Sequence, residues 1–419
     1  MESSAKRRLE SISRHLIQPS QRILSSGFCP SPLSVDTGFW ERAPVVIGGM
    51  VLDIQAIPRE EPSPGTTTPG KVRYINGGVA RNVAECMSKL GTKPLIISVI
   101  GADMAGEQLM SYWKSTGLPT EGILKLEGVA TPVVSVVFGS KGESVAAVAS
   151  VDAVESSLTP GWVERFHQNI CGAPVVMVDA NLPFQTLEFA CRMAVGAGVP
   201  VWFEPVSVIK SSRIAPVANF VTCTSPNEGE LIAMANVLSP QTKFEINLEE
   251  IKEKGLPVED LFQMLKSAII SLLDKGIKLL LITLGSNGLF LCHSRNLNFC
   301  RENYNSNLNA DRFLGQLYQA VNSIYYNGFF ARSSSEFCAF HFPAIPAEVV
   351  SVIGAGDCLV AGTLAGICAG LDVVRSVAVG VVAAKAAVES KNNVADKFLV
   401  TNIRDEVKEV LSCVKPLLL

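Results

Sequence analysis

The residues Gly354-Ala355-Gly356-Asp357 open a long stretch rich in alanine and glycine, which predicts a helix that begins at this point. The free N–H groups and the dipole of a helix start favour negative charge, and glycine lets a ligand approach the backbone closely. Asp357 stands beside these groups as a candidate general base. This combination suits the transfer of a phosphoryl group to an alcohol, although a Gly-x-Gly-Asp sequence alone also occurs as a plain helix start.

A second glycine-rich stretch, Asn76-Gly77-Gly78-Val79-Ala80-Arg81-Asn82, lies near the other end of the chain. It predicts a glycine turn followed by a helix, with Asn82 one turn into that helix. The amide of Asn82 could bind substrate hydroxyls, and Asp53, after an early apolar strand, could accept hydrogen bonds from them. Each stretch also has a purely structural interpretation, so the pair carries more weight than either part.

Together the two stretches resemble the two signatures of the ribokinase-like (PfkB) carbohydrate kinases, and the resemblance extends over residues 44–412. It implies an α/β fold, a three-layer sandwich with a mostly parallel central sheet and a small β lid. It also implies that Asp357 is the base and that the acceptor sugar is held opposite it. The implied anion hole is Gly354, Ala355 and Gly356, and the implied sugar-binding residues are Asp53, Gly77, Gly78 and Asn82.

Between the two signatures, further sequence motifs occur in the same order along the chain as in that family. Asn227 and Glu230 resemble its Asn-x-x-Glu motif, which acts on Mg²⁺ and the phosphates through water, although the same residues also suit a helix start. An apolar strand that ends in a glycine turn resembles the segment that binds ATP. The implied nucleotide-binding residues are Thr283, Gly285 and Gly288.

Within the family, the amino-acid sequences of the stretches 77–84, 178–182 and 202–206 resemble those of the pseudouridine kinases. The implied reaction phosphorylates the ribose 5'-hydroxyl of pseudouridine with ATP, and Asn181 is placed near the base. Two alternatives stay open, because a fold does not fix a substrate. One is a kinase for ribose, a hexose or adenosine, and the other is a catalytically silent relative that binds or assembles.

One departure concerns the residues before Gly354. Many sugar kinases have Asp-Thr-x there, and the Asp helps to bind a monovalent cation, whereas this chain has Ser351-Val352-Ile353. The resemblance therefore implies ATP and Mg²⁺ but leaves K⁺ activation open.

A competing nucleotide motif lies at 65–71, where Gly-Thr-Thr-Thr-Pro-Gly-Lys matches the first seven positions of a P-loop. Val72 replaces the Ser or Thr that would bind magnesium, and Pro69 removes an N–H group that a phosphate cradle needs. We therefore expect no phosphate site there.

Composition fits one large domain over residues 44–419. The chain has 419 residues, 48% of them hydrophobic, and a net charge of −3, which gives no field that would recruit nucleic acid. Its 11 cysteines lack zinc-like pairs and indicate reduced thiols in a reducing compartment. The apolar region 361–388 contains charged residues, so buried helices are expected there rather than a membrane span.

Two further segments have distinct patterns. Residues 131–152 predict a hairpin. In the family such strands belong to a lid that can pair two subunits, so the resemblance implies a candidate homodimer through the lid. Residues 293–342 include an asparagine-rich run and predict a surface insertion.

The N-terminal extension, residues 1–43, is rich in serine and arginine and has little apolar periodicity. Arg8 and Leu9 precede His15 and Leu16 by seven residues, which is nearly two helical turns, so both pairs would share one helix face. This resembles a type-2 peroxisomal targeting signal for an import receptor. A mitochondrial or chloroplast transit peptide, or a cytosolic protein, is the alternative.

Overall fold

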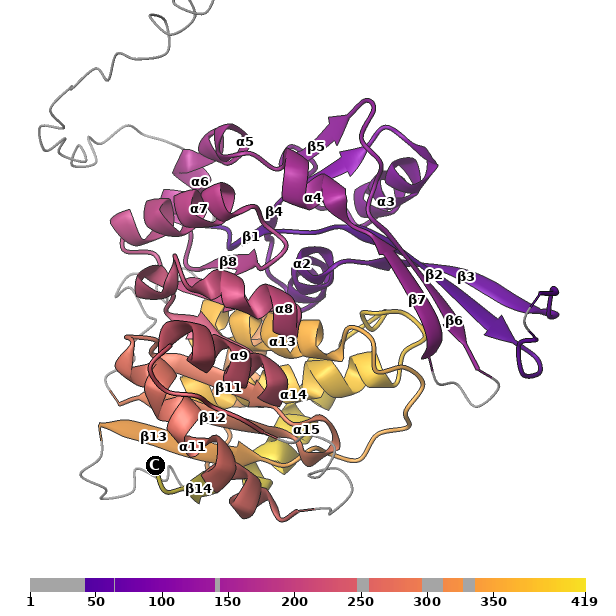
Figure 1. Cartoon of the computed structure of the whole chain (residues 1–419). Coiled ribbons are helices and arrows are strands. Elements are labelled where there is room, and N and C mark those ends of the chain that lie inside the picture. Colours follow the sequence, from indigo (N-terminus) through magenta and orange to yellow (C-terminus); the bar gives the residue numbers. More distant parts are fainter. Residues whose placement is uncertain (1–41, 64, 140–143, 247–255, 296–311, 327–335) are drawn as a thin grey trace, which may run out of the picture. The chain divides into compact units, whose positions relative to one another are not determined.

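The computed structural model describes residues 42–63, 65–139, 144–246, 256–295, 312–326 and 336–419. Their core is a ten-stranded sheet with the order β14-β13-β12-β11-β10-β9-β8-β1-β4-β5 (Figure 1). The strands from β5 to β11 run parallel, whereas β12, β13 and β14 are added antiparallel. A second sheet has the order β3-β2-β6-β7 and forms the lid.

The main sheet is built from β1 (Val45–Ile47), β4 (Leu95–Gly101), β5 (Ile123–Leu126), β8 (Val176–Asp179), β9 (Val201–Glu204), β10 (Cys223–Thr224), β11 (Leu279–Thr283), β12 (Leu289–Ser294), β13 (Phe337–Phe342) and β14 (Lys415–Leu417). The lid is built from β2 (Val51–Pro58), β3 (Gly70–Gly77), β6 (Val133–Phe138) and β7 (Ser144–Ser150). The helices are α2 (Val79–Lys89), α3 (Met104–Ser115), α4 (Asp152–Ser157), α5 (Pro160–Glu164), α6 (His167–Gly172), α7 (Phe184–Gly196), α8 (Val208–Ser211), α9 (Glu228–Leu238), α11 (Val258–Asp274), α12 (Phe313–Asn322), α13 (Ala355–Ala369), α14 (Val373–Val388) and α15 (Val400–Cys413).

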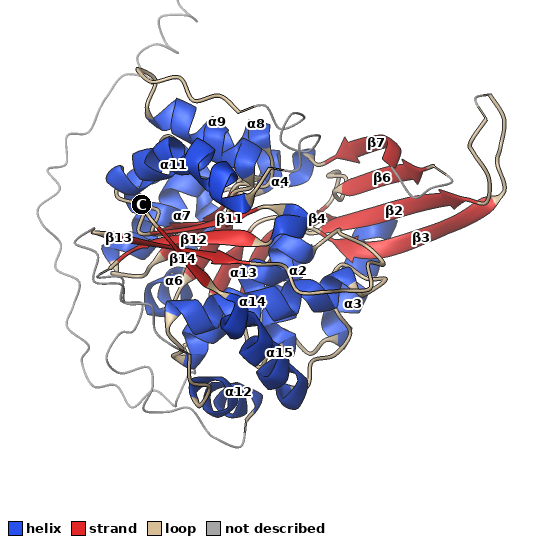
Figure 2. Ribbon diagram, turned by 90° about the horizontal axis from the view of Figure 1, so that it is seen from below, coloured by secondary structure: helices blue, strands red, loops and turns tan. Residues whose placement is uncertain are grey.

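Helices cover both faces of the main sheet, and the strand sequences show why. Alternate side chains of a strand point to opposite faces. In β11, Leu279 and Leu281 join the core under α2, α13, α14 and α15, whereas Leu280 and Ile282 join the core under α7, α9 and α11. Figure 2 shows these two helical layers with the sheet between them. The predicted three-layer α/β sandwich with a mostly parallel sheet is confirmed.

The lid differs from the expectation in size. β6 and β7 lie where the hairpin of residues 131–152 is predicted, but β2 and β3 complete a four-stranded sheet. Asp53, which follows β1 as expected, therefore lies within a lid strand, opposite Ile75. Gly77 is the last residue of β3, and α2 begins at Val79, so Asn82 lies one turn into the helix, as predicted. The lid and the start of α2 are thus one continuous piece of chain.

Residues 65–71 form no phosphate loop. Gly70 and Lys71 begin β3 and pair with Pro58 and Ile57 of β2, so a strand begins where a P-loop would lead into a helix. This agrees with the rejection of the P-loop match on chemical grounds.

The segment 293–342 is only partly an insertion. His293 and Ser294 complete β12, and β13 lies between β12 and β14 in the main sheet, so the expectation of a surface insertion is wrong for both ends. Helix α12 contributes Leu317 and Val321 to the core. The asparagine-rich run at 296–309 lies outside the described residues, as does nearly all of the N-terminal extension 1–43, of which only residues 42 and 43 are described.

The carboxyl ends of the parallel strands gather polar residues at one edge of the sheet. Asp179 ends β8 beside Glu204 at the end of β9, and Thr283 ends β11. In open α/β sheets this edge holds the ligand site, where the strand order reverses.

The apolar region 361–388 forms the buried helices α13 and α14. Of the helices that the structure describes, none has both the length and the apolar character needed to cross a membrane.

Candidate active site

The start of α13 leaves backbone donors and empty space at one place. Gly354 has φ 83°, a left-handed conformation, and a Cβ there would lie 2.3 Å from the carbonyl oxygen of Asn393. At Gly356, in contrast, a Cβ would meet no atom of the described chain within 4 Å. The N–H groups of the first turn have no partner within the helix, although that of Ala355 donates to the carbonyl oxygen of Val352 at 3.4 Å, and the residue before the helix offers no side-chain cap. The turn is therefore closed toward the protein and open toward a ligand, as an anion site requires.

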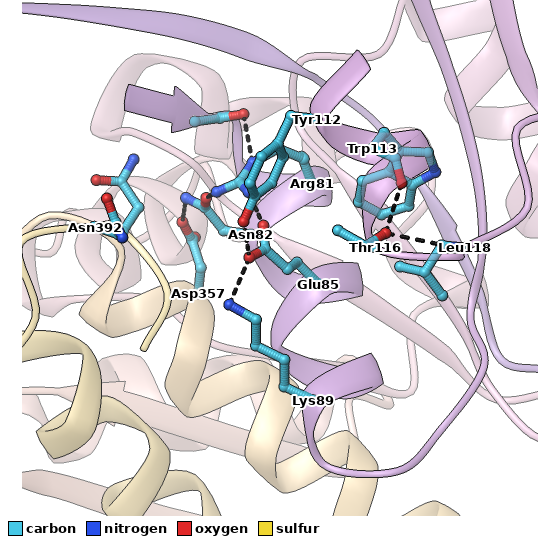
Figure 3. Close-up of polar contacts among 12 residues, drawn as sticks. Arg81, Asn82, Glu85, Lys89, Tyr112, Trp113, Thr116, Leu118, Asp357 and Asn392 are labelled. Carbon is cyan, nitrogen blue, oxygen red and sulfur yellow. Dashed lines mark hydrogen bonds and ion pairs between the residues drawn. The ribbon is translucent and has the colours of Figure 1, made fainter. Parts of the chain in front are cut away.

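Asp357 lies in this first turn and is half-buried. Its Oδ2 accepts a hydrogen bond of 2.6 Å from Nδ2 of Asn82, one turn into α2 (Figure 3). Burial raises the pKa of Asp357 to about 7, while the bond from Asn82 and the charge of Arg81 oppose that rise. A carboxylate whose pKa lies near neutrality suits a general base.

The turn before α2 brings the backbone close to Asp53. A Cβ on Gly77 would lie 2.2 Å from Oδ2 of Asp53, and a Cβ on Gly78, where φ is 95°, would lie 2.4 Å from the carbonyl oxygen of Gly49. Burial raises the pKa of Asp53, against the hydrogen bond from Asn393 and the charge of Arg81. Only glycines fit here, so the two glycines and the carboxylate form one tightly built element.

Asn393 connects the two glycine-rich stretches. Its Nδ2 donates to Oδ2 of Asp53 at 2.8 Å, and its own carbonyl oxygen packs against Gly354 and accepts a bond from the Cys358 thiol at 3.5 Å. The side chain is 2% exposed. Asn393 therefore sets the position of the α13 start relative to the lid strand that carries Asp53.

A chain of buried charges follows Asn82 along α2. Arg81 donates to Oδ1 of Asn82 and to Glu85, and Glu85 accepts from the Tyr112 hydroxyl at 2.6 Å and pairs with Lys89 at 2.7 Å (Figure 3). Although burial opposes it, the charges of Arg81 and Lys89 lower the pKa of Glu85. The face of α2 that carries Asn82 is thus fixed by ion pairs among Arg81, Glu85 and Lys89.

Asn181 lies beside a fully buried carboxylate. Asp179 accepts from the backbone N–H of Gly49 at 2.8 Å and from that of Asn181 at 2.9 Å, and burial raises the pKa of Asp179. Oδ1 of Asn181 accepts from Lys210 at 2.8 Å, and Lys210 also pairs with Glu155 of α4. The position predicted to lie near a nucleobase therefore belongs to a polar cluster that joins the main sheet to the helix following the lid.

Glu204 is a third acidic group at this edge. It accepts from the Ser225 hydroxyl, which in turn accepts from Nε1 of Trp202 at 2.8 Å. Burial raises the pKa of Glu204 well above its ordinary value, and the negative charges of Asp357 and Glu230 raise it further. These electrostatic couplings link the start of α13 with the start of α9.

The predicted metal-binding and nucleotide-binding residues also meet. Asn227 caps α9: its backbone N–H donates to Glu230 and its Oδ1 accepts from the Glu230 N–H, both at 2.9 Å. The N–H of Thr283 donates to the carbonyl oxygen of Pro226 at 2.9 Å, in a parallel bridge between Asn227 and Thr283. The capping interpretation of this motif is therefore correct, and it does not conflict with a role near phosphates.

The turn after Thr283 is also open. Gly285 has φ 57° and a Cβ there would meet nothing within 4 Å, whereas a Cβ at Gly288, with φ 86°, would lie 2.0 Å from the carbonyl oxygen of Phe342. As at the α13 start, one glycine is required by the packing and the other leaves room.

Carboxylate and amide oxygens at this edge suit a hard cation such as Mg²⁺. Burial raises the pKa of Glu230, so a nearby cation would relieve a charge that the protein solvates poorly. The described residues contain no group of three or more His, Cys, Asp and Glu side chains that could hold a metal by themselves. Glu230 and Asn227 therefore fit a metal held mainly by phosphates and water.

Sequence reasoning missed four residues of this site: Arg81, Asp179, Glu204 and Asn393. Arg81, Asp179 and Glu204 stand inside stretches already singled out, and each is a charged residue in an otherwise apolar or glycine-rich run. That contrast was the available signal. Asn393 lies in a polar loop without a motif, so nothing local marked it.

The family of pfkB carbohydrate kinases matches residues 43–304 and 328–397 of the chain. The gap between these ranges contains α12. A pseudouridine kinase of Arabidopsis thaliana is 46% identical over 383 residues, which cover 90% of this chain and 98% of that protein. A pseudouridine kinase of Escherichia coli K12 is 25% identical over 193 residues, covering 46% of this chain and 61% of that protein.

Solved structures show the same fold at low identity. The structure of Arabidopsis thaliana ribokinase complexed with ribose and ATP has a TM-score of 0.61 at 19% identity, and covers 88% of this chain and 98% of that chain. Ribokinase from Giardia lamblia has a TM-score of 0.62 at 16% identity, with 88% and 99% covered. The fold predicted from the two glycine-rich stretches is confirmed by both kinds of comparison.

Proposed function

Because the chain belongs to the pfkB family of carbohydrate kinases, we propose that it transfers the γ-phosphoryl group of ATP to the 5'-hydroxyl of pseudouridine. The observation that carries the proposal is the contact between Asp357 and Asn82, next to the open side of Gly356. Similarity to the Arabidopsis pseudouridine kinase over nearly its whole length favours this substrate.

Asp357 takes the proton of the 5'-hydroxyl as that oxygen attacks the γ-phosphorus. The bond between the γ-phosphorus and the β-bridging oxygen breaks, ADP leaves, and the proton passes from Asp357 to solvent. The N–H groups of the first turn of α13 stabilise the negative charge on the transferring group. Asp53, Gly77, Gly78 and Asn82 hold the ribose, and Asn181 lies toward the base. The chemistry is mainly positioning and electrostatics.

The nucleotide side is assigned to Thr283, Gly285 and Gly288, with Gly354, Ala355 and Gly356 at the phosphates. Glu230 and Asn227 would hold Mg²⁺ through water. Bound Mg²⁺ neutralises charge on the phosphate oxygens. K⁺ is a further candidate activator, and with Ser351 in place of an acidic residue we expect a weak response to it.

The proposal is tested by incubating the purified chain with ATP, Mg²⁺ and pseudouridine, uridine, ribose or adenosine, with and without K⁺. ADP and the phosphorylated product are measured. Uridine is the matched control because it is an isomer of pseudouridine, with the same ribose and the same uracil base joined through nitrogen instead of carbon. Turnover that is selective for pseudouridine supports the proposal. Selective turnover of another acceptor replaces the substrate, and ATP binding without turnover of any acceptor favours the silent relative.

We also propose a homodimer through the lid. β3 and β7 are the edges of the four-stranded sheet, and Val72, Tyr74 and Val148 on them are 59%, 56% and 72% exposed. Unpaired edges with apolar side chains favour pairing with a second chain. Sedimentation measurements should show a dimer that Val148→Asp weakens; a monomer at all concentrations would contradict this.

Finally, we propose import into peroxisomes through Arg8, Leu9, His15 and Leu16, which lie outside the described residues. The support is the seven-residue spacing of the two pairs. Residues 1–43 fused to a fluorescent protein should reach peroxisomes, and Leu9→Arg should abolish this. Delivery to mitochondria or chloroplasts, or retention in the cytosol, would contradict the proposal.

A further inference from the structure

Arg81 carries a charge that is almost completely shielded from water, since the residue is 2% exposed. Its Nε donates to the carbonyl oxygen of Gly77 at 3.0 Å, and its two terminal nitrogens donate to Glu85 and to Oδ1 of Asn82. A buried guanidinium is tolerated only when it is paired and hydrogen-bonded. Here its bonds reach the turn that faces the substrate and the side chain next to Asp357.

The chemistry of these groups fixes the orientation of the Asn82 amide. A guanidinium has only donors, so the amide atom that faces Arg81 must be the oxygen. The amide nitrogen then faces Asp357, to which it donates at 2.6 Å. With the amide turned over, N–H groups would face a cation and a carbonyl would face a carboxylate. Both contacts would be repulsive.

We propose that Arg81 is a positioning residue for phosphoryl transfer: it fixes the amide of Asn82, which holds Oδ2 of Asp357 and leaves Oδ1 for the acceptor hydroxyl. The inference rests on the proposed function only in taking Asp357 as the base. It does not depend on which alcohol is phosphorylated.

The anchoring of Arg81 supports this role. Its partner Glu85 is held by Tyr112 of α3 at 2.6 Å and by Lys89 at 2.7 Å, and Lys89 also donates to the carbonyl oxygen of Ala395 at 2.9 Å. Bonds from α3 and from the segment after α14 thus keep the guanidinium in place. In Figure 3, Arg81 and Asn82 lie between Tyr112 and Asp357, so the network ends at the base.

Arg81 is also the cation that stabilises the charged form of the base. Asp179 from β8 and Asp53 from β2 face Asp357 with negative charge, and Asp357 in turn raises the pKa of Glu204 from β9. Burial raises the pKa of Asp357 most, and the charge of Arg81 acts against it. Loss of Arg81 should therefore both loosen Asn82 and make Asp357 harder to ionise.

The test removes the ion pair as a unit, because breaking one side of the buried pair between Arg81 and Glu85 can unfold the protein. The variant is Arg81→Met with Glu85→Gln. A second variant, Arg81→Lys, keeps a cation but loses the planar fork. The matched control is Arg375→Met, which breaks a half-buried arginine pair with Asp372 at the start of α14.

For R81M/E85Q we expect kcat/KM to fall about 100-fold, since misplacement by an ångström costs about that much. The acid limb of its pH profile should move to higher pH. R81K should keep the position of the acid limb but lose about 10-fold in kcat. R375M should change neither. In an Asn82→Ala background, R81K should lower kcat only slightly further, because Arg81 and Asn82 both act through the hydrogen bond to Asp357.

The readout that separates this inference from the proposed function is the titration of the Asp357 carboxyl by carbon-13 NMR in the protein without substrates. A higher pKa in R81M/E85Q than in the wild type supports the inference, even if pseudouridine is not the acceptor. Identical titrations in the two folded proteins would overturn it. If R81M/E85Q does not fold, R81K decides: wild-type kcat in that variant, or full additivity with N82A, would overturn the inference.

Discussion

The proposed acceptor side and the proposed nucleotide side of the candidate site are built differently. On the acceptor side, side chains from distant parts of the chain bind one another directly: Asn82 to Asp357, and Asn393 to Asp53. On the nucleotide side, the described groups are backbone turns around glycines, and Gly356 and Gly285 border open space. The acceptor side is thus preorganised by charge and hydrogen bonds, whereas the nucleotide side supplies a surface that phosphates complete.

The largest effect should come from removing the base. Asp357→Asn keeps the size of the side chain but cannot accept a proton, so kcat should fall by about 10³-fold or more while ATP binding stays near that of the wild type. Turnover and ATP affinity are measured separately. Near-normal kcat would exclude Asp357 as the base and remove the distinction between the two sides.

A pair of glycines two residues apart tests the nucleotide side. Gly356→Ala adds a methyl group where the protein leaves space, so stability should be kept while kcat/KM falls about 100-fold, comparable to losing one oxyanion donor. Gly354→Ala should instead lower the free energy of unfolding by about 2 kcal/mol, because φ is 83° and Asn393 blocks the Cβ. Thermal unfolding and kinetics distinguish them. Equal behaviour of the two variants would contradict the comparison.

Asn393 tests the second side-chain contact of the acceptor side, its hydrogen bond to Asp53. Asn393→Ala removes the hydrogen bond to Asp53, a bond to a charged group worth about 1.5–3 kcal/mol, so kcat/KM should fall about 10- to 100-fold. The loss should appear mainly as a higher KM for the acceptor, with KM for ATP unchanged. The control is Asn322→Ala, which alters an exposed asparagine on α12. A change in KM for ATP alone would contradict the assignment of Asn393 to the acceptor side.

The smallest effect concerns stability and pH. The pKa of Asp357 is about 7 in the folded chain against an ordinary 3.8, so the folded state holds the proton more tightly than the unfolded state does. This carboxyl therefore lowers the free energy of unfolding progressively as pH rises from about 4 to 7, and D357N should remove that loss. At pH 8 the variant should be more stable by at most about 4 kcal/mol, because each unit of the pKa shift is worth about 1.4 kcal/mol and a half-buried group realises only part of it, and the difference should vanish near pH 4. Denaturant unfolding at both pH values measures it; a variant less stable at pH 8 would refute the raised pKa.

The parts of this structure that sequence predicts are those with a local cause. Gly354 to Asp357 and Gly77 to Asn82 are visible because turn geometry demands glycine at fixed spacing from a polar side chain. Strands such as β4 and β11 are visible as apolar runs, because both faces of a parallel sheet are buried.

The parts that sequence does not predict have distant causes. Asn393 and Asp53 are 340 residues apart, and no local pattern connects them. Arg81 in a helix is normally an exposed residue, so its burial becomes visible only when α3 and α13 are packed around it. β2 and β3 are missed because polar residues interrupt both strands, and because β2 is largely half-buried and much of β3 is exposed. β13 is missed because an asparagine-rich run precedes it.

The most direct test of the account is the pH dependence of kcat/KM for pseudouridine with saturating ATP and Mg²⁺. We expect measurable turnover and an acid limb with an apparent pKa near 7, which reports the buried Asp357 in the enzyme before the acceptor binds. No turnover of pseudouridine while another acceptor is phosphorylated would contradict the substrate. A profile that is flat down to pH 5 would contradict the buried base.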